Sequence, residues 1–305
     1  MIQLSRRKFL AMAGVTGAAA LGGFSLWASI KQNLKKVTIL HTNDTHSRLD
    51  PFPASDPQFP GMGGYARRAA FVRQARLQDP ELLLLDSGDI FQGTPYFNLF
   101  GGVPELKLMS QMGYDAATMG NHEFDNGLQG FYDVLPNAQF PFVSSNYDFS
   151  RTQLHDKVKP HLVFRRNGVK IGIYGLGINL AGLVSPVQIG DTVYLDPVEM
   201  ARETESQLKN RHNCDLIICL SHLGFQYSHD QISDMKLAGE TYFTDVILGG
   251  HTHTLLDPPV VANNARNQPV TIAQTGFGGV RIGLIEAIFN ENTNEKFVES
   301  NTKII

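Results

Sequence analysis

Five short polar clusters, each placed directly after an apolar strand-like run, constrain the fold of this chain more than any other feature. All are rich in Asp, Asn, His, Ser or Gly. They are "NDTH" (43–46), "SGD" (87–89), "GNHEFD" (120–125), "SHLG" (221–224) and "GGHTH" (249–253). Open α/β sheets bind ligands at the carboxyl ends of their strands. We therefore expect the five clusters to converge on one crevice.

Helical patterns alternate with the strand-like runs, which indicates an α/β fold with helices covering the sheets. Helices are predicted over 65–78, 104–113, 197–211 and 230–238. A hairpin is predicted over 161–177, with Asn167-Gly168 as its turn, and a run of hairpins over 259–290. No internal repeat breaks this pattern, so we expect a single domain.

The N-terminus carries an export pattern. Its "SRRKFL" stretch (5–10) has paired arginines followed by Phe-Leu, and an uncharged, Ala/Gly-rich stretch follows. This resembles the twin-arginine signal, which is recognised by machinery that exports folded proteins across the bacterial inner membrane. We expect a signal peptide or anchor over 1–30, a polar linker over 31–36 and the domain over 37–305. The protein would be periplasmic, or anchored in the inner membrane if the signal stays uncleaved.

The net charge argues against nucleic-acid binding, and the positions of the two cysteines argue against a disulfide between them. A net charge of −3 gives no electrostatic case for nucleic-acid binding. Cys214 and Cys219 lie on one apparent strand, where so short an extended span cannot bring the two sulfurs together. We therefore expect two free, buried thiols.

The polar clusters contain the donors of a metal site. Asp, His and Asn supply oxygen and nitrogen ligands that suit zinc, manganese or iron, and no thiolate is present among them. The D-x-H of 44–46 and the H-x-H of 251–253 place both side chains of each pair on one side of an extended segment. A lone D-x-H is common by chance, and "SHLG" alone fits a core histidine. All five clusters in order favour a site.

At this point the sequence resembles a known family. D-x-H, G-D, G-N-H-E, S-H and G-H-x-H, in that order, are similar to the signature of calcineurin-like metallophosphoesterases. The strings "ILHTNDTH", "LLLDSGDIFQGT", "MGNHEFDNG" and "VILGGHTH" resemble the 5′-nucleotidase and UDP-sugar hydrolase branch. The resemblance covers nearly all of the chain after residue 36. It implies the N-terminal catalytic domain of that branch, a four-layer αββα sandwich of two mixed sheets, with two divalent metal ions.

Carried over position by position, the resemblance implies a complete set of site residues. The implied metal ligands are Asp44, His46 and His253 for one metal, Asn121, His222 and His251 for the other, and Asp89 as the bridge. His122 and Asp125 match the catalytic His–Asp pair of the family. Asn121 and His122 would also contact the substrate.

The expected chemistry is hydrolysis of phosphate esters, with nucleotides as the expected substrates. Two divalent ions can lower the pKa of a water that bridges them, so that hydroxide attacks at neutral pH. His122 would then bind a phosphoryl oxygen or protonate the leaving group, and Asp125 would fix its tautomer and keep it cationic. Such an enzyme belongs to nucleotide catabolism.

Residues next to these positions are expected to have other roles. We assign Glu123 to structure, as an acid at a helix start. His41 is predicted to be a core or supporting residue. Arg67 and Arg68 are predicted to be solvated helix charges. The remaining histidines, expected at the surface, are His155, His161, His212 and His229.

The specificity of the reaction stays open at this point. Relatives of this branch usually carry a second domain with an aromatic clamp for the base, whereas this chain ends soon after its last hairpin. Its one tryptophan, Trp27, lies in the signal, and we identify no aromatic set that would stack a base. The alternatives are a self-sufficient enzyme of broad specificity, a catalytic subunit with a separate nucleotide-recognition chain, and a thiosulfohydrolase-like enzyme. A non-enzymatic metal-binding module is disfavoured by the intact His122–Asp125 pair.

Overall fold

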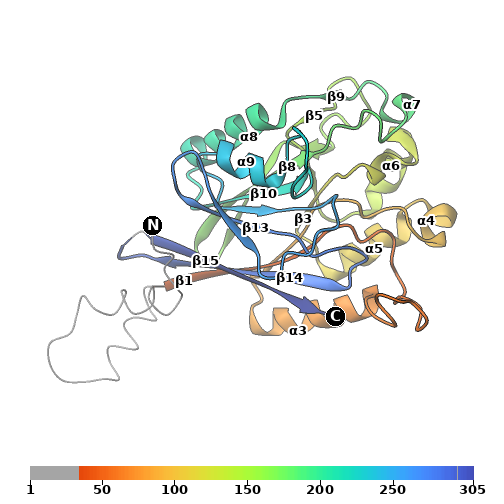
Figure 1. Cartoon of the computed structure of the whole chain (residues 1–305), viewed down its shortest axis with the longest axis horizontal. Coiled ribbons are helices and arrows are strands. Elements are labelled where there is room, and N and C mark those ends of the chain that lie inside the picture. The colour runs from red at the N-terminus through yellow and green to blue at the C-terminus, as the bar shows by residue number, and fades with distance from the viewer. Residues whose placement is uncertain (1–33, 294) are drawn as a thin grey trace.

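The computed structural model describes residues 34–293 and 295–305, which form two facing sheets with helices on both outer sides (Figure 1). The larger sheet, in spatial order, contains β15 (Glu295–Ile304), β14 (Arg281–Asn290), β1 (Leu34–Thr42), β2 (Leu83–Asp86), β3 (Ala116–Thr118), β4 (Phe142–Val143) and β6 (Val158–Lys159). The smaller contains β12 (Val260–Asn263), β13 (Pro269–Ala273), β11 (Val246–Leu248), β10 (Leu216–His222), β8 (Val169–Gly177) and β7 (His161–Arg166). A separate ribbon pairs β5 (Tyr147–Asp148) with β9 (Val193–Tyr194).

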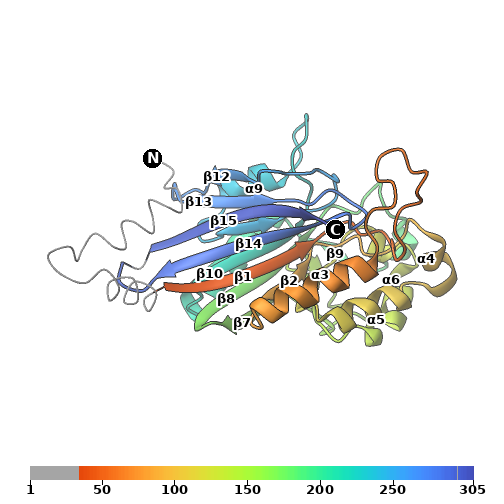
Figure 2. The same ribbon diagram turned by 90° about the horizontal axis from the view of Figure 1, so that it is seen from below.

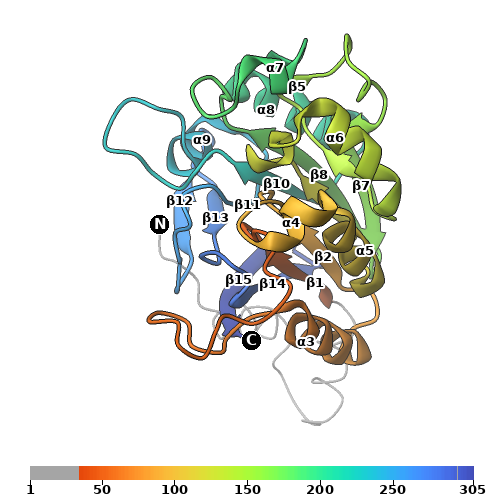
Figure 3. The same cartoon turned by 90° about the vertical axis from the view of Figure 1, so that its right-hand side faces the viewer.

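The helices belong to two groups. On the side of the larger sheet lie α3 (Tyr65–Gln78), α4 (Pro95–Phe100), α5 (Val103–Met112), the short η1 (His122–Phe124), α6 (Gly127–Val134) and η2 (Leu135–Asn137). Later in the chain come α7 (Pro186–Ile189), α8 (Pro197–Ser206), η3 (Gln207–Arg211) and α9 (Asp234–Glu240). Figures 1 and 3 show α8 and α9 on one side of the paired sheets and α3 on the other, and Figure 2 shows α3 from its outer side. The αββα sandwich is confirmed.

Three apolar cores separate the four layers. Between the sheets, Val37 and Ile39 of β1 share a core with Ile171 of β8 and Ile218 of β10. Leu40, on the opposite face of β1, packs in the core under α3 and α5. A third core lies between the smaller sheet and helices α8 and α9. Because both faces of the central parallel strands are buried, these strands read as continuous apolar runs.

The predicted hairpin over 161–177 is confirmed, whereas the tail differs from the prediction. β7 and β8 pair antiparallel, and Asn167 and Gly168 form the turn with positive φ. In the tail, β12 pairs with β13 and β14 with β15, but β13 and β14 belong to different sheets. The connecting segment 274–280 therefore crosses the sandwich beside the end of β1. The amide of Gly278 donates there to the carbonyl of Asp44 at 2.7 Å.

The described part of the chain starts inside the predicted linker. β1 begins at Leu34, paired with Asn290 of β14, rather than at Val37. The predicted signal over 1–30 lies outside the described residues. Among the residues with a described structure, no helix is long and apolar enough to cross a membrane.

Candidate metal centre

The five polar clusters meet at one end of the sandwich, where parallel strands of both sheets end (Figure 3). β1, β2 and β3 lead into 43–46, 87–89 and 120–125, and β10 and β11 lead into 221–224 and 249–253. The two sheets are joined here by the hydroxyl of Ser87, which donates to the carbonyl of Leu248 at 2.8 Å. The predicted convergence on one place is confirmed.

Asp44, His46 and His253 form the first group of candidate ligands. The Nε2 atoms of His46 and His253 lie 2.9 Å apart, and Nε2 of His253 lies 3.5 Å from Oδ1 of Asp44. One ligand atom of each residue lies within 4.8 Å of the other two. Donors from both sheets thus surround a volume that suits a single cation.

Asp89, His222 and His251 form the second group, and its geometry calls for a positive charge. Nδ1 of His222 lies 2.7 Å from the carbonyl oxygen of Ser87, which can only accept, so Nδ1 carries the proton. In the neutral ring, Nε2 of His222 presents a lone pair, buried and 3.0 Å from Oδ2 of Asp89. Two acceptors this close repel each other unless a proton or a cation lies between them. This donor set fits zinc, manganese or iron.

Burial and neighbouring charges together set the pKa values at this centre. Burial alone would lower the pKa of His222, but the charge and the hydrogen bond of Asp89 outweigh it and raise that pKa to about 10. Burial raises the pKa of Asp44 to about 8. The pKa of Asp89 lies below its ordinary value, because the interaction with His222 outweighs the burial of Asp89. A proton on His222 therefore takes, in the metal-free protein, the place that a cation would take.

Asp89 lies at the junction of two ligand groups. Its carboxylate is close to His222 and His251, and also to His46 and His122. Oδ1 of Asp89 accepts from the amide of His122 at 2.9 Å. This is the position that a bridging carboxylate requires, although bridging itself stays a prediction. Asn121 joins the same centre, since its Oδ1 lies 2.9 Å from Nδ1 of His251.

The backbone at the centre is strained. Several candidate ligands occupy the left-handed region, which non-glycine residues rarely adopt: Asp44 (φ 49°), His46 (φ 47°), Asp89 (φ 53°), His251 (φ 72°) and His253 (φ 52°). Each such conformation costs about 1 kcal/mol or more and persists only where the surroundings enforce it. Gly120 is required for the close approach of two loops, because a Cβ there would lie 2.2 Å from Oδ1 of Asp89.

The predicted His122–Asp125 pair is formed on η1 and the turn that follows it. Nδ1 of His122 lies 2.8 Å from Oδ2 of Asp125, and both side chains are partly exposed at the open side of the centre. Burial lowers the pKa of His122, but the hydrogen bond to Asp125 and the charge of Asp89 outweigh it, so the pKa is raised. Nδ1 is engaged by Asp125, which leaves Nε2 to meet a ligand.

Glu123 does more than start a helix, and this is the role that sequence reasoning missed. Its buried carboxylate accepts from the amides of Asp89 at 2.9 Å, Ile90 at 2.8 Å and Gly120 at 2.6 Å. Burial raises its pKa to about 7. Glu123 therefore ties the loop that carries Asp89 to the loop that carries Asn121. The only signal in the sequence was its place inside "GNHEFD".

Three further residues bear on the predictions. His41 is fully buried, as expected of a core residue, and its ring fills the space that a Cβ at Gly283 would take. Arg67 is exposed as predicted, whereas the prediction for Arg68 was wrong. Arg68 is fully buried, with its guanidinium 4.4 Å from the centre of the Tyr65 ring, because the helix turns this side chain toward the larger sheet.

Other predictions concern residues away from the centre. Cys214 and Cys219 are free and buried, as expected. His155 and His229 are exposed, and His161 and His212 are half-buried at the surface with their rings 5.2 Å apart. None of these four histidines is in a candidate ligand group of the described residues.

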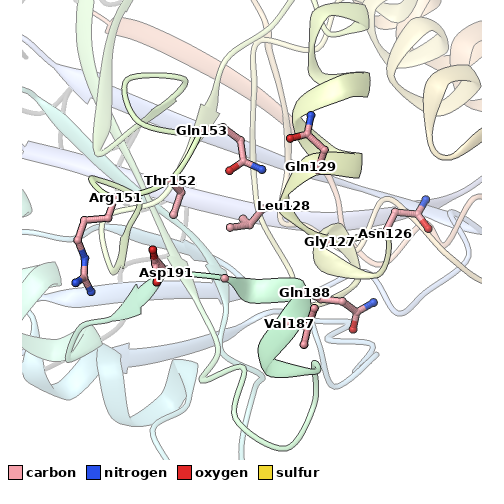
Figure 4. A pocket seen from close by; sticks show the side chains of 11 residues that line it. Asn126, Gly127, Leu128, Gln129, Arg151, Thr152, Gln153, Val187, Gln188 and Asp191 are labelled. Carbon is pink, nitrogen blue, oxygen red and sulfur yellow. The ribbon is translucent and has the colours of Figure 1, made fainter.

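A pocket of about 530 Å³ lies between α6, α7 and the 151–153 loop (Figure 4). Asn126 and Gly127 line one end, and Arg151 and Asp191 line the other. Gln188, also in its lining, donates its side-chain amide to the carbonyl of Asp125. The pocket thus adjoins the loop that carries the His122–Asp125 pair.

Comparisons with known proteins agree with this centre. The family described as calcineurin-like phosphoesterase matches residues 37–255. The trifunctional nucleotide phosphoesterase protein YfkN of Bacillus subtilis is 32% identical over 90% of this chain and 20% of its own length. The rat 5′-nucleotidase is 33% identical over 88% of this chain and 49% of its own length. The crystal structure of a 5′-nucleotidase precursor from Thermus thermophilus superposes with a TM-score of 0.78 at 32% identity, covering 88% of this chain and 54% of that one. The chain thus spans about half or less of the length of these proteins.

Proposed function

The chain belongs to the calcineurin-like phosphoesterase family, and from this premise we propose that it hydrolyses phosphate esters, with nucleotides as substrates. One observation carries the metal-dependent part. Asp44, His46 and His253 place their ligand atoms within 4.8 Å of one another, and so do Asp89, His222 and His251. The nucleotide part is supported by similarity to the nucleotide phosphoesterase and the 5′-nucleotidases named above.

Two metal ions are proposed to bind at this centre. We assign the metal ligands as Asp44, His46 and His253 for one ion, Asn121, His222 and His251 for the other, and Asp89 between them. When bound, the ions supply positive charge to a phosphoryl group and activate water at neutral pH. Zinc, manganese and iron all accept such nitrogen and oxygen ligands.

His122 is the proposed catalytic side chain, supported by Asp125. Because Asp125 accepts from Nδ1 at 2.8 Å, the ring is oriented and Nε2 is available to donate to a phosphoryl oxygen or to the leaving oxygen. A raised pKa favours the cationic ring, which attracts the charge that develops on the phosphoryl oxygens. Asn121, next to it, offers a neutral oxygen and so adds no negative charge.

We further propose export by the twin-arginine machinery into the periplasm, with retention in the inner membrane as the alternative outcome. The arginine pair at 6–7 and the apolar stretch after it support this. Replacing both arginines by lysine should leave the protein in the cytoplasmic fraction. Unchanged recovery from the periplasm would contradict a twin-arginine route.

A separate chain that recognises the nucleotide is the second candidate arrangement. In this arrangement, recognition of the nucleotide comes from residues outside the part of the 5′-nucleotidases that this chain matches, which is about half of their length. The purified chain would then hydrolyse AMP and a simple aryl phosphate with similar kcat/KM. Strong discrimination in favour of AMP by the chain alone would remove the need for that partner.

The decisive experiment measures metal-dependent hydrolysis. The purified protein is stripped with a chelator, refilled with Mn²⁺ or Zn²⁺, and assayed with AMP, a UDP-sugar and an aryl phosphate. We expect turnover only after metal is restored, and a loss of about 10²–10³-fold for His122→Ala. His155→Ala, at an exposed histidine, is the matched control. Metal binding without turnover of any ester would contradict the proposed function.

A further inference from the structure

An aromatic surface adjoins the metal centre, contrary to the expectation that the chain lacks an aromatic set for stacking. The ring of Phe277 lies parallel to the ring of His253, with centroids 5.0 Å apart and planes 15° apart. Phe59 meets Phe277 edge to face at 5.5 Å. We call Phe59 and Phe277 the aromatic shelf. Sequence reading missed it because its two rings are far apart along the chain.

Hydrogen bonds and ring contacts hold the shelf against the metal centre. Phe277 belongs to the segment that crosses between the sheets, and the next residue, Gly278, donates its amide to the carbonyl of Asp44 at 2.7 Å. Phe59 lies on the proline-rich loop, where its amide donates a hydrogen bond to Oδ1 of Asp56 at 2.7 Å. Phe52 of the same loop packs against both shelf rings, at 5.3 Å and 6.1 Å. Both rings are thus positioned by backbone contacts.

Phe59 and Phe277 are partly exposed, which distinguishes a binding surface from the buried core of a loop. Phe52 is 7% exposed and anchors the loop, with the guanidinium of Arg48 4.2 Å from its ring centre. Phe59 and Phe277 stay partly exposed although they pack against it. The side chain of His253, on which Phe277 stacks, is 40% exposed. The apolar surface therefore continues outward from the open side of the metal centre.

Two histidine rings connect the aromatic shelf to His122. His122, His46, His253, Phe277 and Phe59 follow one another with centroid separations of 5.3, 4.9, 5.0 and 5.5 Å. The first end of this row is polar, with the His122–Asp125 pair. The other end is apolar and aromatic. A phosphate ester with its phosphoryl group near His122 and the candidate metal ligands would thus place an aromatic ring of its leaving group toward the shelf.

We propose that the aromatic shelf, Phe59 and Phe277, binds the aromatic ring of the leaving group, such as the nucleobase of a nucleotide. Offset or edge-to-face contact with such a ring is favourable and tolerates different bases. The inference rests on the proposed function. It assigns base recognition to this chain itself.

The test compares AMP with ribose 5-phosphate, which share the phosphorylated ribose and differ in the base. The variants are Phe277→Leu and Phe59→Leu, which keep an apolar side chain. Phe243→Leu, at a partly exposed phenylalanine that precedes β11 at the opposite end of the strand, is the matched control. We expect each shelf variant to lower the ratio of kcat/KM for AMP to that for ribose 5-phosphate by about tenfold. The control should keep the wild-type ratio.

Adenosine binding to the metal-free protein, measured by calorimetry, gives a readout independent of catalysis. We expect weaker binding to both shelf variants than to the wild type and to Phe243→Leu. An unchanged ratio together with unchanged adenosine binding overturns the shelf and leaves the phosphoesterase function standing. An equal fall for both esters also overturns it, since Phe277 would then act only through His253. If the wild type hydrolyses neither ester, the proposed function fails, and adenosine binding still decides the shelf.

Discussion

The carboxylate of Glu123 accepts a hydrogen bond from the amide of Asp89 at 2.9 Å, and this contact connects two loops of the candidate metal centre. The same oxygen accepts from the amide of Gly120 at 2.6 Å. The backbone of Asp89 has φ at 53°, a left-handed conformation in which the Cβ atom lies unfavourably close to the next carbonyl oxygen. Glu123 therefore enforces the conformation of the residue that we place between the two metals.

Glu123→Gln should weaken metal binding, because an amide NH₂ group would replace one acceptor facing the backbone amides of Asp89 and Gly120. Supporting residues of this kind typically change metal affinity by about 10–100-fold. Competition with a chelator measures the affinity directly. Glu199→Gln, at an exposed acid of α8, is the control and should keep the wild-type affinity. Wild-type affinity in Glu123→Gln would show that the contact is dispensable.

Gly120→Ala should abolish high-affinity metal binding. A Cβ at this position would lie 2.2 Å from Oδ1 of Asp89, so one of the two loops must move. Gly239→Ala is the matched control, because its Cβ meets nothing within 4 Å and the residue lies in α9. An alanine in a helix should raise stability by about 0.5–1 kcal/mol. Metal analysis and thermal unfolding measure the two effects, and equal metal content in both variants would contradict the first.

Asp125→Asn should move the alkaline limb of the pH–rate profile to lower pH. Burial lowers the pKa of His122, but the hydrogen bond and the charge of Asp125 help to raise it above its ordinary value. The cationic ring is then lost only as pH rises through that raised pKa. Without the carboxylate, the ring loses its proton at lower pH. The profile of kcat/KM measures this, with Asp133→Asn, at an exposed acid of α6, as the control. An unmoved limb would exclude His122 as the group that titrates.

His41 should make the fold sensitive to acid. Burial lowers its pKa from 6.5 to about 3, so the folded state holds the ring neutral while the unfolded chain protonates it. This destabilisation is absent above about pH 6.5 and grows by about 1.4 kcal/mol per pH unit as the pH falls toward 3. Urea unfolding of the metal-free protein between pH 7 and 4.5 measures the slope. His41→Leu should flatten it, whereas His155→Gln, at an exposed histidine, should not. Equal slopes in both variants would refute this origin.

The sequence by itself determined the helical and strand-like segments and the polar clusters that meet at one end of the fold, whereas the four-layer sandwich was implied by the resemblance to the family. Apolar runs, helical spacing and the Asn167-Gly168 turn follow from local preferences that act over a few residues, so they were readable without coordinates. The polar clusters were also readable without coordinates, because several Asp, Asn and His side chains gathered directly after a strand indicate a binding site. The contact of His122 with Asp125 was implied by the match to the catalytic His–Asp pair of the family, and the two residues lie within one turn of the chain.

Only the tertiary structure decided which distant segments meet. The hydrogen bonds that Glu123 accepts from the amides of Asp89, Ile90 and Phe91 join segments that are far apart in sequence, and so does the stacking of Phe277 on His253. The burial of Arg68 depends on which face of its helix is covered. The passage of 274–280 between the sheets likewise brings Phe277 beside His253, where a local hairpin was expected. Patterns over a few residues of sequence do not predict such contacts, because the contacts form only when complete sheets and loops pack against each other.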